Sequence, residues 1–176
     1  VGRNRNILKE LKGKYRDRLN TYYVDLGNEK SIDEFFKELE GEEINLLING
    51  AGIGELGYFE DIPYENEKKM IDINIVAVIK FTKYFYNKID GIINISSTAG
   101  FQCGGPLMSG YYATKSFVNS FTFGLMGEGG RTKLMLLCPG PTLTNFKGVD
   151  KELKGLAKFY TTTPEEVAEK CYFDYL

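Results

Sequence analysis

The sequence predicts an α/β fold in which helices cover both faces of a doubly wound parallel sheet. Short apolar runs of strand length alternate with helical patterns along the chain, and the runs 44–50 and 91–96 are almost wholly apolar, as in strands covered on both faces. The 176 residues have the length of one domain, and 43% of them are hydrophobic, which is enough for a core. We therefore expect a single α/β domain over 1–176.

The individual elements follow from periodicity and from start signals. Apolar spacing predicts helices at 5–15, 31–40, 63–87 and 111–126 and a last helix after 163, and apolar or β-branched runs predict strands at 18–26, 44–50, 91–96 and 133–138. Pro63 is expected to open the long helix, and Ser31 with Glu34 predicts a capping box. A second box is predicted by Thr163 and Glu166, with a proline between them.

Composition excludes several classes of function. A net charge of −2 with interspersed signs argues against a nucleic-acid or membrane-surface partner, and no apolar run approaches membrane-spanning length. The chain has no histidine, which excludes histidine-based triads, histidine-zinc sites and a histidine general base. Cys103, Cys138 and Cys171 are odd in number and far apart, so we expect a reduced, cytoplasmic protein without a metal site.

Gly52, Gly54 and Gly57 form a G-x-G-x-x-G pattern after an apolar run. A pyrophosphate-binding turn of this pattern lies between the first strand of its fold and a helix that begins at once. Here 58–62 intervenes before the helix, and two strand signals precede the glycines. The pattern is therefore interpreted as a tight turn after a strand rather than as a pyrophosphate site.

Tyr111 and Lys115 lie four residues apart on a predicted helix, which places both side chains on one face. A lysine ammonium near a phenol favours the phenolate, so we expect a lowered pKa for Tyr111 and a role in proton transfer. Ser97 follows the predicted strand 91–96, at the sheet edge where open α/β sheets bind ligands.

Five motifs in order resemble the short-chain dehydrogenase/reductase family, over essentially the whole chain. They are NGAG at 49–52, DIN with Asn74, NISSTAG with Ser97, YYATK with Tyr111 and Lys115, and PGPTLT at 139–144. The resemblance implies a Rossmann-type doubly wound parallel sheet of a bacterial-type member. Gly50 stands where the family has a second asparagine, and Ser97 and Tyr111 lie one residue further apart than is common.

The resemblance implies reversible hydride transfer between a nicotinamide and a carbonyl or alcohol carbon. Tyr111 would exchange the proton with the substrate oxygen, and Lys115 would lower the tyrosine pKa and bind the nicotinamide ribose. Ser97 would hold the substrate oxygen, and Asn74 would fix a water that joins Lys115 to solvent. No metal is needed for this chemistry.

The resemblance also implies a set of cofactor-binding residues: Arg3, Asp25, Leu26, Asn49, Gly50, Ala51, Gly52, Tyr111, Lys115, Pro139, Gly140, Thr142 and Thr144. NAD-preferring members carry an acid after the second strand, where this chain has Gly2 and then Arg3. A guanidinium favours a 2′-phosphate, so NADP(H) is expected over NAD(H).

The remaining expectations concern substrate and assembly. The stretch 140–160 is predicted to be a mobile loop on the substrate side, and the apolar residues there and at 101–108 predict a fairly apolar pocket. The resemblance implies a homodimer or homotetramer through the helices 63–87 and 111–126, with apolar residues that include Val78, Phe85, Phe117 and Phe121.

Two alternatives stay open beside the dehydrogenase interpretation. A non-catalytic nucleotide-binding regulator or scaffold could keep the fold, although it would have no need of Asn74, Ser97, Tyr111 and Lys115 together. A nucleotide-sugar epimerase or dehydratase of the extended branch is disfavoured by the early P-G turn.

The family's T-G-x-x-x-G-x-G motif and its first and last strands are missing, and Val1 to Arg3 is interpreted as the end of the second strand. We therefore expect the 176 residues alone to bind NADP(H) poorly or not at all, and to aggregate or remain loosely folded. A version extended at both ends is expected to fold and to bind.

Overall fold

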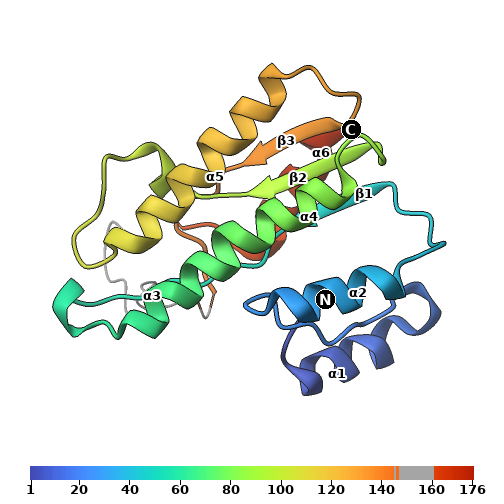
Figure 1. Ribbon diagram of the computed structural model, residues 1–176, viewed down its shortest axis with the longest axis horizontal. Coiled ribbons are helices and arrows are strands. Elements are labelled where there is room, and N and C mark those ends of the chain that lie inside the picture. The colour runs from blue at the N-terminus through green and yellow to red at the C-terminus, as the bar shows by residue number, and fades with distance from the viewer. Residues whose placement is uncertain (145, 147–160) are drawn as a thin grey trace. The chain divides into compact units, whose positions relative to one another are not determined.

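A computed structural model describes residues 1–144, 146 and 161–176 of the chain. The chain divides into two compact units, Val1–Glu43 and Ile44–Leu176, which are described separately below. Most of the loop predicted at 140–160 lies outside the described residues, as does Asn145. Figure 1 shows the elements and their labels.

The first unit contains two helices, α1 (Arg5–Tyr15) and α2 (Glu29–Glu38), joined through a 3₁₀ turn, η1 (Arg16–Arg18). The strand predicted at 18–26 is wrong in this form, because within the unit Gly2 and Tyr23 make a single parallel bridge instead of a ladder. Its two hydrogen bonds, Gly2 N to Tyr22 O and Val24 N to Gly2 O, are both 3.1 Å long. Arg18, the first residue of the predicted strand, lies in the 3₁₀ turn η1 instead.

The start of α2 differs from the predicted capping box. Asn28 is the N-cap, since its side-chain oxygen accepts hydrogen bonds from the backbone N–H groups of Lys30 and Ser31. The Ser31 hydroxyl instead accepts a 3.1 Å hydrogen bond from the backbone N–H of Asp25, which ties the helix to the preceding turn. Asn28 thus caps the helix in place of Ser31, and asparagine is as strong an N-cap residue as serine.

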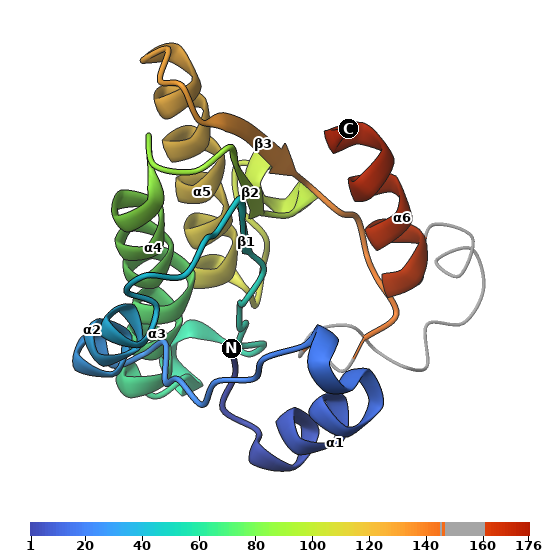
Figure 2. The ribbon, with the colours of Figure 1, turned by 90° about the vertical axis from the view of Figure 1, so that its right-hand side faces the viewer.

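In the second unit, the described residues form a three-stranded parallel sheet in the order β1 (Leu46–Asn49), β2 (Gly91–Ile95), β3 (Lys133–Leu137). Helices α4 (Ala77–Phe85) and α5 (Ser109–Gly127) cover one face, and α6 (Pro164–Tyr175) covers the other (Figures 1 and 2). The predicted doubly wound parallel arrangement is confirmed. The strands at 46–49, 91–95 and 133–137 fall inside the predicted runs.

The long helix predicted at 63–87 is interrupted. It consists of α3 (Tyr64–Ile71), a π-helical turn η3 (Asp72–Val76) and α4. Pro63 precedes the first helical residue. The helix ends at Phe85, after which Tyr86 leaves the helical backbone with ψ 132° and Asn87 is left-handed with φ 61°.

Two of the apolar residues expected at a subunit interface lie in the core instead. Val78 and Phe85 are each only 6% exposed within the unit. Phe117 and Phe121 are half-buried, and their rings stack with centroids 5.6 Å apart.

A chain of polar side chains crosses the core between the sheet and its helices. Asn49 of β1 donates to Asn94 Oδ1 of β2 at 2.8 Å and to Thr82 Oγ1 of α4 at 3.1 Å. Asn94 donates in turn to Thr122 Oγ1 of α5 at 2.9 Å. These bonds join both strands to both helices without leaving the amides unpaired.

The last helix begins as predicted. Glu166 N donates to Thr163 Oγ1 at 3.2 Å, and Thr163 N donates to a carboxylate oxygen of Glu166 at 2.7 Å. This reciprocal capping box fixes the start of α6. Of the helices in the described part of the chain, none is both long enough and apolar enough to span a membrane.

Candidate active site

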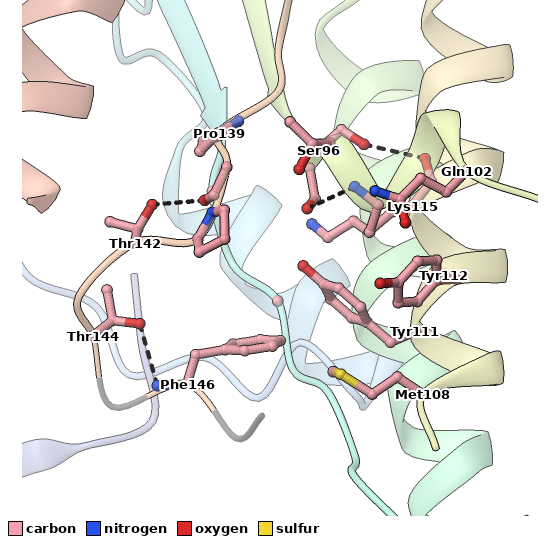
Figure 3. Close-up of a pocket in the computed structure, with 17 residues that line it drawn as sticks. Ser96, Gln102, Met108, Tyr111, Tyr112, Lys115, Pro139, Thr142, Thr144 and Phe146 are labelled. Carbon is pink, nitrogen blue, oxygen red and sulfur yellow. Dashed lines mark hydrogen bonds between the residues drawn. The ribbon is translucent and has the colours of Figure 1, made fainter. Parts of the chain in front are cut away.

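A cavity of about 390 Å³ lies at the carboxyl edge of the sheet in the second unit. The segments that follow β1, β2 and β3 all reach it, and the first two turns of α5 close one side (Figure 3). Open α/β sheets bind ligands at this edge. The lining comprises Gly50, Gly52, Ser96, Ser97, Thr98, Ala99, Gln102, Met108, Tyr111, Tyr112, Lys115, Pro139, Gly140, Pro141, Thr142, Thr144 and Phe146.

Helix α5 presents Tyr111 and Lys115 to this cavity from one face, as their spacing predicts. The Lys115 ammonium donates a 3.0 Å hydrogen bond to the carbonyl oxygen of Ile95 and lies 5.8 Å from the centre of the Tyr111 ring. Lys115 is 7% exposed, and this burial lowers its pKa to about 8, against a smaller opposing effect of Cys138. The ammonium form therefore predominates at neutral pH.

Ser97 stands opposite Tyr111, at the end of β2. Its hydroxyl oxygen accepts a 3.1 Å hydrogen bond from Ala99 N and caps the turn η4 (Thr98–Phe101), which fixes the side chain at the cavity. The neighbouring Ser97 side chain lowers the pKa of the Tyr111 phenol.

The expected lowering of the Tyr111 pKa is nevertheless wrong, because the net shift is upward. Burial of the phenol has the largest effect and raises the pKa above 10.0, because the phenolate loses hydration in the cavity. Tyr111 is thus a neutral phenol at neutral pH.

Asn74 lies in the π-helical turn η3, where its side chain is 1% exposed. Its amide makes a reciprocal pair with Ile53: Asn74 Oδ1 accepts from Ile53 N at 2.9 Å, and Nδ2 donates to Ile53 O at 2.8 Å. Nδ2 also donates to Thr114 Oγ1 at 3.0 Å, and the Thr114 hydroxyl donates to Tyr111 O at 2.8 Å. Asn74 therefore joins the glycine-rich segment to the turn of α5 that carries Tyr111.

Gly52 marks the point where Asn74 and Lys115 converge. A Cβ atom at Gly52 would lie 3.5 Å from both Asn74 Oδ1 and Lys115 Nζ. The structure thus brings Ser97, Tyr111 and Lys115 together at the cavity, with Asn74 directly behind Gly52.

The cofactor-binding residues predicted in the second unit divide into two groups. Six line the cavity besides Tyr111 and Lys115: Gly50, Gly52, Pro139, Gly140, Thr142 and Thr144. Asn49 instead directs its amide to Asn94 and Thr82, and Ala51 lies outside the cavity lining.

The other three predicted cofactor residues belong to the first unit. Arg3 and Asp25 form an ion pair at 3.5 Å, and both side chains are partly exposed. Asp25 Oδ1 also accepts a 3.1 Å hydrogen bond from Gly27 N, which shapes the turn that contains Leu26.

Several residues of the site were missed by sequence reasoning. Thr114 could have been found, because it follows Tyr111 by three residues on the same helical face. The backbone groups of Ile53 and Ile95 carry no sequence signal for their bonds to Asn74 and Lys115, since both contacts join distant segments.

Comparison with known proteins agrees with this geometry. A family model described as short chain dehydrogenase matches residues 1–154. The chain belongs to the short chain dehydrogenase family. The predicted family and the predicted fold are thus confirmed.

Relatives in the family differ in how much of their length the chain covers. It is 35% identical over 125 residues to the human very-long-chain 3-oxoacyl-CoA reductase, a match that covers 66% of the chain and only 40% of that protein. It is 32% identical over 193 residues to the Escherichia coli (strain K12) NADP-dependent 3-hydroxy acid dehydrogenase YdfG, with 98% of the chain and 76% of that protein covered.

Two solved structures have the same fold. The closed form of a serine dehydrogenase complexed with NADP⁺ superimposes with a TM-score of 0.81 at 28% identity, covering 98% of this chain and 76% of that one. A 4-hydroxyisoleucine dehydrogenase complexed with NADH superimposes with a TM-score of 0.82 at 24% identity, covering 97% and 76%.

Proposed function

We propose that the protein is an NADP(H)-dependent oxidoreductase that interconverts a carbonyl compound and its alcohol. The observation that carries the proposal is the convergence of Ser97, Tyr111 and Lys115 on one cavity at the carboxyl edge of the sheet. A hydroxyl, a phenol and an ammonium around one small cavity are suited to proton transfer to and from a substrate oxygen.

In the reducing direction, Tyr111 donates its proton to the substrate oxygen. Burial favours the neutral phenol, which is the form that can donate. The Ser97 hydroxyl donates a hydrogen bond to the same oxygen and stabilises the charge that develops there. The Lys115 ammonium lies near the phenol and lowers the energy of the phenolate that remains after proton transfer.

The residues at the cavity fit a nicotinamide dinucleotide, which would supply or accept the hydride. Lys115 uses one of its three N–H donors for Ile95 O, and its cavity side can bind the hydroxyls of a ribose. Thr142 and Thr144 add hydroxyl groups on the opposite wall (Figure 3). Gly52 adds no side chain to the cavity beside Lys115 and Asn74, which a Cβ atom at this position would contact.

The preference for NADP(H) rests on Arg3. Its guanidinium is held by Asp25 and partly exposed, so it can meet a 2′-phosphate. The relative YdfG is named NADP-dependent, whereas one structural neighbour is complexed with NADH. Asp25 and Leu26 are proposed to contact the adenine.

We further propose a homodimer or homotetramer whose subunits meet through the predicted helix 63–87, which is α3, η3 and α4, and through α5. Val78 and Phe85 are excluded from this interface by their burial, so half-buried residues such as Phe117 and Phe121 would contribute. Sedimentation of the purified protein as a monomer at micromolar concentration would contradict this assembly.

The activity is tested by following NADPH oxidation by the purified full protein against panels of ketones, aldehydes and acyl thioesters. We expect turnover with at least one panel and its loss in Tyr111→Phe. Tight NADPH binding without turnover on any panel would favour the scaffold alternative instead.

A further inference from the structure

The ring of Phe146 lies inside the candidate active site, against the ring of Tyr111. The two ring centroids are 5.1 Å apart with the planes inclined by 55°. Figure 3 shows the Phe146 ring pointing across the cavity toward Tyr111, from the segment that carries Thr144. The Thr144 hydroxyl accepts a 3.2 Å hydrogen bond from Phe146 N, which fixes the backbone from which the ring projects.

Gly54 makes this position of the ring possible. Gly54 is buried, and a Cβ atom built on it would lie 2.6 Å from Phe146 Cζ and 2.9 Å from Phe146 Cε1. The same Cβ would lie 3.3 Å from Cδ2 of Tyr111. Any side chain at 54 would therefore displace the Phe146 ring, so Gly54 is matched to an aromatic residue far away in the sequence.

We propose that Phe146, seated between Gly54 and Tyr111, is the residue that limits the bulk of the substrate beside its reacting oxygen. This inference rests on the proposed function, because it places the substrate oxygen at Tyr111. A ring at this distance from the phenol occupies the space into which a large substituent of the carbonyl carbon would extend. The site accordingly accepts compact or linear carbonyl compounds and disfavours those with an aryl or branched group on the carbonyl carbon.

The size and chemistry of the cavity agree with this substrate class. Its volume of about 390 Å³ has to hold the proposed nicotinamide as well as the substrate, which leaves little room for a bulky substituent. Met108 and Tyr112 add apolar surface on the α5 side, while Gln102 and Thr144 are polar. A compact substituent of the substrate would thus pack against the Phe146 ring without displacing it.

The test compares 2-butanone, a compact ketone, with acetophenone, which carries an aryl group on its carbonyl carbon. For the parent protein and Phe146→Ala, kcat/KM is measured with NADPH for both ketones. Their Kd values are measured by calorimetry with and without NADP⁺. We expect the kcat/KM ratio of acetophenone to 2-butanone to rise at least tenfold in Phe146→Ala, and the Kd ratio of acetophenone to 2-butanone to fall at least tenfold. The matched control is Phe59→Ala, since Phe59 is 73% exposed and absent from the cavity lining.

A second variant tests the contact itself. Gly54→Ala is expected to lower kcat/KM for both ketones, because the displaced ring has to move within the cavity. Adding Phe146→Ala to Gly54→Ala should restore the 2-butanone value to within about threefold of that of Phe146→Ala alone. Failure of this rescue, with thermal unfolding like that of the parent, would overturn the proposed contact.

The outcomes separate the two proposals. Turnover with an unchanged ketone ratio in Phe146→Ala would overturn this inference and leave the proposed oxidoreductase intact. Absence of turnover in the parent on these ketones and on every panel of ketones, aldehydes and acyl thioesters would overturn the proposed function, and the ratio of Kd values would then decide the inference. Equal changes in the two Kd values would contradict it, and a larger gain for acetophenone would support it.

Discussion

The ammonium of Lys115 donates a 3.0 Å hydrogen bond to the carbonyl oxygen of Ile95, the last residue of β2. This bond fixes the side chain of α5 to the strand end while keeping a charge in a site where Lys115 is 7% exposed. The same position that makes the charge useful to Tyr111 makes it costly to the folded state.

Replacing Lys115 by methionine should change how stability depends on pH. The pKa of Lys115 is about 8 in the folded protein and 10.5 without the fold, so the unfolded chain binds more protons between these pH values. As the pH rises through that window, the free energy of unfolding of the parent should increase by about 3 kcal/mol because of Lys115. Lys115→Met should lack this increase. Urea unfolding at pH 7, 8.5 and 10 measures the difference.

The matched control for that experiment is Lys170→Met. Lys170 is an exposed lysine of α6 that pairs with Asp174 at 3.0 Å. The free energy of unfolding of Lys170→Met should differ little from that of the parent at all three pH values. A constant stability difference between the parent and Lys115→Met from pH 7 to 10 would contradict the burial of a charged lysine.

Tyr111→Phe should reduce turnover by about 10²- to 10⁴-fold, the usual contribution of a positioned proton donor. The variant keeps the aromatic ring that contacts Phe146, so thermal unfolding and NADPH binding should stay close to those of the parent. Steady-state NADPH oxidation and fluorescence titration measure the two effects. Tyr172→Phe, at an exposed position on α6, is the control, and equal kcat values for parent and Tyr111→Phe would end the assignment.

Thr114→Val should separate positioning from chemistry. The substitution removes a hydroxyl that accepts from Asn74 and donates to Tyr111 O, and the loss of one buried partner costs about 1–3 kcal/mol. We expect lower stability and a lower kcat with little change in KM, because the bond network that places Tyr111 loosens. Thr114→Ser keeps the hydroxyl and should restore both values, whereas a serine variant as impaired as the valine variant would refute this role.

Two glycines that pack on or lie in α5 should respond in opposite ways to alanine. A Cβ at Gly100 would lie 2.7 Å from the carbonyl oxygen of Lys115 and 2.6 Å from Asn119 Nδ2, so α5 would have to shift. Gly124 has no atom within 4 Å of its added Cβ.

Gly100→Ala should therefore destabilise the protein by about 1–3 kcal/mol and reduce kcat, because the backbone of Lys115 moves. Gly124→Ala should stabilise it by about 0.5–1 kcal/mol, through helix propensity alone. Thermal unfolding of both variants checks the pair, and equal shifts in Tm would show that the close contact at Gly100 is relieved without cost.

Arg3→Asp should move cofactor preference toward NAD. Loss of a charged partner for a 2′-phosphate and gain of a like charge each cost on the order of 1–3 kcal/mol, so the kcat/KM ratio of NADPH to NADH should fall by tenfold or more. Arg18→Asp is the control, since Arg18 is an exposed arginine of the same unit. An unchanged ratio would show that Arg3 does not recognise the phosphate.

The sequence predicts best what depends on neighbours along the chain. The helix α6 starts where Thr163 and Glu166 predict, because a capping box is built from residues three apart. The pairing of Tyr111 with Lys115 follows likewise from one helical turn. The start of α2 was missed because residues 28–31 are all polar and Asn28, rather than Ser31, adopts the extended backbone of a cap.

Features that join distant segments could not be predicted in this way. The π-helical turn at Asn74 is stabilised by Ile53 and Thr114, which lie 21 and 40 residues away. The pKa of Tyr111 was expected to fall because its lysine neighbour is visible in the sequence, whereas the burial that raises it depends on the folded cavity. The contact of Phe146 with Gly54 is of the same kind.

The polar pair Asn49 and Asn94 has a consequence for how β1 finds its partner during folding. Gly91–Asn94 of β2 are all buried, so alternation of apolar and polar residues does not distinguish one alignment of the strands from the next. In the native alignment Asn49 stands opposite Asn94, and a slip by one residue would set it opposite Ile93 or Ile95. Each amide left unpaired by the slip costs about 1–3 kcal/mol, so misaligned pairings would be disfavoured roughly tenfold or more. The two asparagines therefore select the alignment of a strand whose other residues are uniformly apolar.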